Sequence, residues 1–201
     1  MRLALQLLAP YLSVVLFWCI WPNAWLAILS YHLQILLWRN PALLRLRMPT
    51  GSTGFVFAAM SALAGPTLYF LLPHMQRTEL ASWLASYKLS GISLMLMVPY
   101  FGLVHPVLEQ SHWHGLRERT RWAHPAFAGY HMIVLSTLLT APWLLACFLV
   151  LVTASLAWTR SGRVTGSLVP SVVSHVLADL GIVLAALAHV RMAAPGVFSW
   201  P

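Results

Sequence analysis

The chain has 201 residues, of which 60% are hydrophobic and only 8% are charged, and its mean hydropathy is +0.76. Soluble domains carry about 25% charged residues, so this composition excludes an ordinary soluble enzyme. The net charge of +8 comes from basic residues scattered at the ends of apolar segments. That distribution excludes a nucleic-acid-binding patch and favours membrane lipids with anionic headgroups as partners.

A membrane-spanning helix needs about 20 mostly apolar residues, and segments of that kind recur along the whole chain. We therefore predict an all-α, polytopic transmembrane helix bundle that forms a single membrane domain over residues 1–201. The seven predicted spans are residues 3–21, 23–39, 54–75, 89–110, 124–141, 143–159 and 167–190. Tight turns at Pro22-Asn23 and Ala141-Pro142 separate two of the pairs. Residues 79–88 are typical of a short amphipathic helix that lies in the membrane interface.

The basic residues predict the orientation of these spans. With the N-terminus inside, Arg77, Lys88 and Arg191 fall on the outer side and the other nine basic residues fall on the inner side. The inner set is Arg2, Arg39, Arg45, Arg47, Arg117, Arg119, Arg121, Arg160 and Arg163. Cytoplasmic loops are enriched in Lys and Arg, so we expect a cytoplasmic N-terminus.

The predicted spans contain two carboxyls, Glu109 and Asp179, and among their histidines are His131 and His175. An ionisable group in hydrocarbon costs about 2.5–3.5 kcal/mol on insertion scales, so such a group usually faces the protein interior and has a function there. Counted from the nearest cytoplasmic arginine, Glu109, His131 and His175 lie at similar depths in three different spans. The sequence therefore predicts that the three side chains meet at one level of the bundle.

The spacing of these residues is that of a hydrolytic site. His175 and Asp179 are four residues apart and share a helix face, as do Phe127 and His131. A carboxylate and an imidazole can together activate a water molecule, and a second imidazole can stabilise an oxyanion.

Three separated patterns carry this chemistry: Glu109-Gln110-Ser111-His112-Trp113-His114, Phe127 to His131, and His175 to Asp179. Their order resembles that of the CAAX-protease and bacteriocin-processing (CPBP) family, which includes the type II CAAX prenyl endopeptidases. That family has Glu-Glu-x-x-x-Arg, then Phe-x-x-x-His, then His-x-x-x-Asn or Asp. The resemblance covers residues 89–190, the expected catalytic core.

The resemblance implies an intramembrane endopeptidase that cleaves a membrane-associated peptide or protein, in the inner membrane of a bacterium. Glu109 and His131 would activate the attacking water, while His175 and Asp179 would form the oxyanion site. It leaves open whether a divalent metal such as zinc takes part; its ligands would then be Glu109, His131 and His175.

The first pattern departs from the family at two positions. Gln110 stands where the family has a second Glu, and His114 stands where it has Arg. A Gln110–His114 hydrogen bond is the expected replacement for the lost ion pair, and Phe127 is expected to support His131.

Other readings stay open. The departures favour a catalytically inactive relative that acts as a scaffold, an immunity protein or a complex subunit. Buried Asp and His residues also occur in proton-coupled transporters, but the chain lacks the inverted repeat that many transporters have. His105, Glu109 and His112 could form a metal site on one helix face, although Pro106 weakens that pattern.

Overall fold

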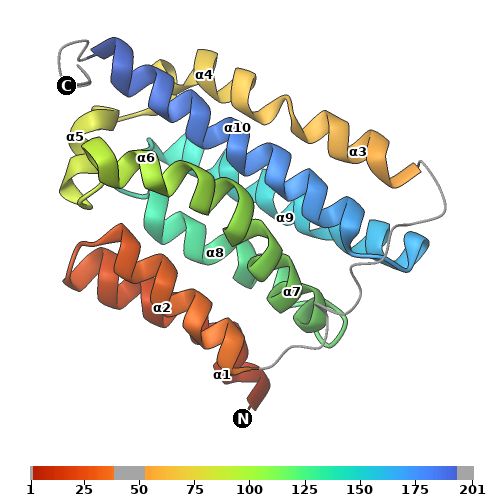
Figure 1. The fold of residues 1–201 in the computed structure, drawn as a ribbon. Helices are drawn as coiled ribbons and strands as arrows, with labels where there is room; N and C mark the ends of the chain where they lie inside the picture. Colours follow the sequence, from red (N-terminus) through yellow and green to blue (C-terminus); the bar gives the residue numbers. More distant parts are fainter. Residues whose placement is uncertain (1, 39–52, 194–201) are drawn as a thin grey trace.

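A computed structural model describes residues 2–38 and 53–193, and over those residues the fold is all-helical (Figure 1). A single bridge between Gln76 and Leu139 is the one extended pairing within the described part of the chain. Arg39, Arg45 and Arg47, on which the predicted orientation partly depends, lie outside the described residues.

Four helical segments are long and apolar enough to cross a membrane. They are α1 (Arg2–Val14) with η1 (Val15–Ile20), α6 (Gly91–Pro99) with η3 (Tyr100–Val104) and α7 (His105–Arg117), α9 (Ala141–Thr165), and α10 (Val169–Ala193). Large apolar side chains such as Leu12, Leu149 and Val150 are exposed on them. Water-exposed surfaces rarely carry contiguous apolar patches of this kind, whereas lipid-facing helices do. The chain therefore has the helices of a membrane protein.

The other three predicted spans correspond to shorter helices. They are α2 (Ala24–Leu37), α8 (Ala123–Leu135), and the pair α3 (Thr53–Ser61) and α4 (Ala64–Met75). The break between α3 and α4 has a local cause, because Pro66 has no N–H to bond the carbonyl of Ala62. The predicted interfacial segment contains the short helix α5 (Leu80–Ser86).

Helix α10 is the centre of the bundle. It packs against α3 and α4 on one side and against η3, α7 and α9 on the other (Figure 1). The contact with α4 depends on two glycines, because a Cβ at Gly65 would lie 2.7 Å from the carbonyl oxygen of Gly181. This backbone contact fixes how α10 presents His175 and Asp179 to the helices opposite.

The helix that carries Glu109 changes its winding one turn before the site. Tyr100–Val104 is a π-helical turn between Pro99 and Pro106. Pro106 has no N–H to bond the carbonyl of Gly102, which loosens the preceding turn, and such π-turns recur at functional sites. The wider turn sets the angular position of Tyr100 relative to His105.

Capping residues define the predicted turns. Asn23 begins α2 by accepting a hydrogen bond from the Leu26 N–H at 3.2 Å, and Pro142 lies in the first turn of α9. Gly166 ends α9 in the left-handed conformation at φ 64°, where a side chain would be strained. The predicted turn at Pro22-Asn23 lies between η1 and α2, whereas the connection before α9 lies at residues 136–140, and Ala141 and Pro142 already belong to α9.

Candidate functional site

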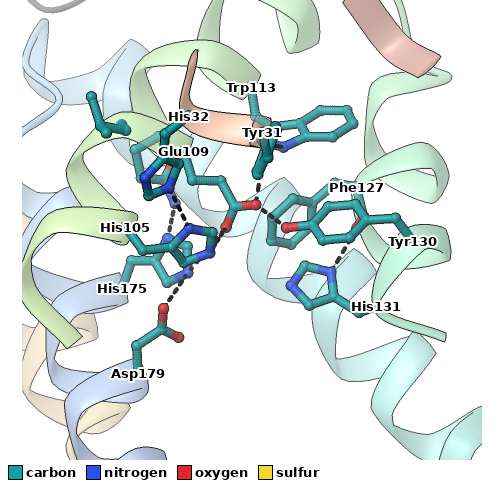
Figure 2. A network of polar contacts seen from close by, with 12 residues as sticks. Tyr31, His32, His105, Glu109, Trp113, Phe127, Tyr130, His131, His175 and Asp179 are labelled. Atoms are coloured by element: carbon teal, nitrogen blue, oxygen red, sulfur yellow. Dashed lines mark hydrogen bonds and ion pairs between the residues drawn. The ribbon is translucent and has the colours of Figure 1, made fainter. Parts of the chain in front are cut away.

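The carboxylate of Glu109 is the centre of a buried polar cluster contributed by four helices (Figure 2). Its Oε1 accepts hydrogen bonds from the hydroxyls of Tyr31 on α2, at 3.3 Å, and Tyr130 on α8. Trp113 donates to the Tyr31 oxygen at 2.9 Å, so the Tyr31 proton points toward the carboxylate. Glu109 itself is 0% exposed. A buried carboxylate requires donors of this kind to offset its lost hydration.

The second oxygen of Glu109 faces two imidazoles. Its Oε2 lies 3.3 Å from Nε2 of His105, one turn earlier on α7, and 3.5 Å from Nε2 of His175 on α10. His175 Nε2 also lies 3.3 Å from Oδ2 of Asp179, one turn further along α10. Figure 2 shows His175 between the two carboxylates. The helical spacing therefore brings His175 and Asp179 onto one face, as predicted.

A fixed chain of donors determines which nitrogen of His175 carries the proton. The guanidinium of Arg117 donates from Nη1 to Oε1 of Gln110 at 2.9 Å, so the amide nitrogen of Gln110 points the other way. That nitrogen lies 3.1 Å from Nδ1 of His175. Because an amide NH₂ only donates, Nδ1 accepts, and the neutral imidazole carries its proton on Nε2. His175 thus presents an N–H between Glu109 and Asp179.

Aromatic rings hold this arrangement in place. Trp158 of α9 stacks on the His175 ring at a centroid distance of 4.6 Å, and its Nε1 donates to Ser174 at 2.9 Å. The Arg117 guanidinium lies over the Phe127 and Trp158 rings, with Cζ 5.1 and 5.4 Å from their centroids. Such cation–π contacts favour a desolvated Arg. Phe127 therefore supports the site through Arg117 as well as through its contact with His131.

His131 has the opposite tautomer from His175. Its Nδ1 lies 2.8 Å from the carbonyl oxygen of Phe127, and a carbonyl can only accept, so Nδ1 carries the proton. The Nε2 lone pair is then free to accept a proton. In Figure 2 the ring edge away from this bond is turned toward the side of the cluster that holds His105 and His175. His131 is half-buried, whereas Glu109 is fully buried.

The predicted residues are thus brought together in part. Glu109, His175 and Asp179 are in contact. Among the described residues, His131 forms no hydrogen bond or ion pair with Glu109; it stacks on Tyr130 at a centroid distance of 4.0 Å, and Tyr130 in turn bonds Glu109.

The expected Gln110–His114 pair is wrong. His114 lies 3.4 Å from Glu118, and Gln110 is bonded by Arg117 and His175. Arg117 lies two helical turns after Gln110, so both side chains project from the same face of α7, and its guanidinium takes the Gln110 amide oxygen.

Sequence reasoning missed Tyr31, Tyr130, His32 and Arg117. His32 carried a usable signal, because it is an ionisable residue inside a predicted span. Arg117 carried another, because its spacing of seven residues from Gln110 predicts a shared helix face. The tyrosines carried none, since tyrosine is common on membrane helices for other reasons.

The donor set does not fit the metal site considered from the sequence. Among the described residues, no three His, Cys, Asp or Glu side chains are grouped to hold a metal ion. His175 directs a protonated nitrogen at Glu109, and a metal needs a lone pair there. The alternative through His112 also fails, because His112 lies 3.1 Å from the Gln6 carbonyl oxygen instead of facing Glu109.

Comparisons with family models, with curated proteins and with solved structures find no match to this chain.

Proposed function

We propose that the protein is a multi-pass intramembrane endopeptidase that hydrolyses a peptide bond of a membrane-associated peptide or protein. The observation that carries this proposal is the pair of opposite tautomers beside a buried carboxylate. Nε2 of His131 offers a lone pair, and Nε2 of His175 offers a proton. Hydrolysis of an amide needs both, a base for the attacking water and a donor for the oxyanion.

The division of roles follows from which atoms are free. Oε1 of Glu109 is already engaged by two tyrosine hydroxyls. Nε2 of His131 therefore takes the proton from water, and the hydroxide attacks the carbonyl carbon. The N–H of His175 stabilises the resulting oxyanion. His131 then passes its proton to the departing amine as the C–N bond breaks, which leaves a carboxylic acid and an amine.

Glu109 and Asp179 stabilise positive charge in this scheme. Both carboxylates lie within 3.5 Å of the imidazole of His175, and they offset positive charge that develops on the imidazoles during the reaction. Because His131 is half-buried and Glu109 is 0% exposed, the substrate approaches from the His131 side of the cluster.

The membrane arrangement belongs to the same proposal. Seven spans with a cytoplasmic N-terminus would put Arg119 and Arg121 at the inner surface, with Glu109 about three turns deeper. Substrate binding and cleavage would then occur in the inner leaflet of a bacterial plasma membrane. The positive-inside distribution of arginines supports this orientation.

The experiment compares membrane-protein fragments in cells that carry the wild type or single variants. His131→Ala, His175→Ala and Glu109→Ala are each expected to abolish processing, a loss of about 10²–10⁴-fold for an acid–base group. The chain offers matched controls on the same helices. His124→Ala serves for α8, His189→Ala for α10 and Glu118→Ala for α7. Normal processing by the His131→Ala protein would refute the proposed mechanism.

One observation favours a second function, that of a catalytically silent scaffold or complex subunit. Glu109 is enclosed by two hydroxyls and two imidazoles, an environment that stabilises a fixed anion. That function predicts a wild-type phenotype for the three alanine variants together with a stable co-purifying partner. The endopeptidase predicts loss of processing without loss of expression.

A further inference from the structure

Three side chains extend the cluster away from Glu109 and have no role in the proposed hydrolysis. Nδ1 of His105 lies 2.9 Å from Nε2 of His32 on α2. Nδ1 of His32 in turn lies 2.7 Å from the hydroxyl of Tyr100 in η3. With the 3.3 Å contact between His105 Nε2 and Glu109 Oε2, these residues form one continuous line. Figure 2 shows His32 and His105 directly beside the Glu109 carboxylate.

While Glu109 is ionised, the hydrogen bonds along this line can run in only one direction. A carboxylate only accepts, so His105 carries its proton on Nε2 and its Nδ1 accepts. His32 must then donate from Nε2, which leaves its own Nδ1 as an acceptor. Tyr100 must donate its hydroxyl proton to that nitrogen. Every proton in the line therefore points toward Glu109.

The surroundings hold this line in place. His32 and His105 are 3% and 4% exposed, so water does not compete for their ring nitrogens. Phe101 stacks on His105 at a centroid distance of 4.7 Å and fixes the plane of the imidazole. Tyr100, in contrast, is half-buried and forms the open end.

The Tyr100 end leads away from Arg117. The Tyr100 ring lies 5.4 Å from that of Trp25, whose Nε1 donates to Ser93 at 3.0 Å. Ser93 donates to the carbonyl of Lys88, which precedes the long segment Gly91–Arg117. Polar groups thus continue from Tyr100 toward the end of the bundle opposite Arg117.

We propose that Tyr100, His32 and His105 form a proton relay that charges and discharges Glu109 without admitting water to the site. Three protons move together, one across each contact: Tyr100 to His32, His32 to His105, and His105 to Glu109. As Tyr100 gives its proton to His32, its oxygen accepts a proton from the medium, so Tyr100 stays neutral and Glu109 becomes neutral. In reverse, Tyr100 releases a proton to the medium as its oxygen accepts the proton of His32, and Glu109 is ionised again.

The purpose of the relay rests on the proposed function, because Glu109 offsets positive charge on the imidazoles only while it is ionised, and the relay sets that state. His32 and Tyr100 are positioning residues in this scheme and do not touch substrate. Other titratable or charged groups also face Glu109 and His105. They are Tyr31 from α2, Arg117 from α7, Tyr130 and His131 from α8, and His175 and Asp179 from α10.

The test reads the tautomers directly, by nitrogen NMR of the full chain labelled with ¹⁵N-histidine in lipid nanodiscs. In the wild type, His32 and His105 are expected to be protonated on Nε2 alone, and His131 on Nδ1 alone. Tyr100→Phe removes the link between His32 and the medium. Exchange of the ring N–H protons of His32 and His105 with D₂O is then expected to slow, while the tautomers, which Glu109 sets, stay as in the wild type and His131 reports an intact fold.

Tyr69→Phe is the matched control, because its hydroxyl contacts Met192 and touches no histidine in the relay. It should leave all tautomers and exchange rates unchanged. Equal exchange rates of the His32 and His105 ring protons in the wild type and in the Tyr100→Phe protein would overturn the relay. So would a wild type in which His32 and His105 carry their protons on different ring positions.

A second measurement needs no variant. The N–H···N bond between His32 and His105 transmits a scalar coupling between the two nitrogens, and its absence in the wild type would also overturn the relay. Neither readout requires cleavage, so the two proposals fail separately. Predicted tautomers in a protein without hydrolytic activity would remove the endopeptidase and retain the relay.

Discussion

The amide nitrogen of Gln110 lies 3.1 Å from Nδ1 of His175, and this contact leaves the imidazole proton on Nε2, which lies 3.5 Å from Oε2 of Glu109 and 3.3 Å from Oδ2 of Asp179. Arg117 fixes the orientation of the Gln110 amide, because its guanidinium can donate only to the amide oxygen. The residue type at position 110 therefore determines the tautomer of His175. A Gln is able to donate to His175 where a Glu would not.

The first prediction concerns Gln110→Glu. The new carboxylate keeps its contact with Arg117, but it can only accept, so Nδ1 of His175 is expected to gain a proton. Nitrogen NMR of the labelled histidine measures this change. Gln34→Glu is the control, since Gln34 bonds Ser13 and the Ser30 carbonyl instead of a histidine. If Nδ1 of His175 stays unprotonated in the Gln110→Glu protein, the tautomer assignment is incorrect.

The second prediction concerns the hydroxyl of Tyr130. Tyr130→Phe removes a donor to the buried Glu109 carboxylate, and a hydrogen bond to a charged group contributes about 1.5–3 kcal/mol to the free energy of unfolding. Tyr11→Phe is the matched control, because Tyr11 also bonds α8 but through the neutral Ala126 carbonyl at 2.8 Å, for which about 1 kcal/mol is expected. Denaturant unfolding in mixed micelles measures both values. Equal losses would contradict an ionised, tyrosine-bonded Glu109.

The third prediction concerns the start of α5. Glu79 accepts hydrogen bonds from the N–H groups of Ala81 and Ser82 at 2.8 and 2.7 Å, and these bonds lower the pKa of its carboxyl below the ordinary 4.5. Because the folded pKa is lowered, the stabilisation is fully present above pH 4.5 and is lost as the pH falls through the folded pKa. Glu79→Ala should therefore cost about 1 kcal/mol at neutral pH and less in acid.

Thermal unfolding at a series of pH values measures the effect of Glu79→Ala. Ser86→Ala provides the comparison on the same helix, because the Ser86 hydroxyl bonds the Trp83 carbonyl and does not titrate. Its effect should be independent of pH. A Glu79→Ala cost that is the same at acid and neutral pH would show that the carboxylate does not cap α5.

Helix periodicity explains why part of the site was predictable. The four-residue spacing of His175 and Asp179 dictates a common face, and the flanking arginines place Glu109 and His175 at one depth. Both inferences need only the rise and the pitch of an α-helix. Hydrophobicity likewise predicted the long apolar helices.

The other contacts of the site depend on the rotation of each helix about its own axis relative to its neighbours. The spacing of residues in the sequence does not specify that rotation. Nothing in the sequence indicates that Tyr130 instead of His131 reaches Glu109, since neighbouring residues differ by about 100° around the helix axis. The π-turn at Tyr100–Val104 also shifts the register between Tyr100 and His105. The alignment of Tyr100 with His32 on another helix follows from that shift.

The central claim is that His131 and His175, beside buried Glu109, hydrolyse a peptide bond. Its most direct test is to incubate purified protein in proteoliposomes with a library of membrane-tethered peptides in H₂¹⁸O. Mass spectrometry then identifies new C-termini and their oxygen content. The account predicts new C-termini that carry ¹⁸O with the wild type and with His124→Ala, and none with His131→Ala. The same peptide profile for the wild type and His131→Ala would contradict it.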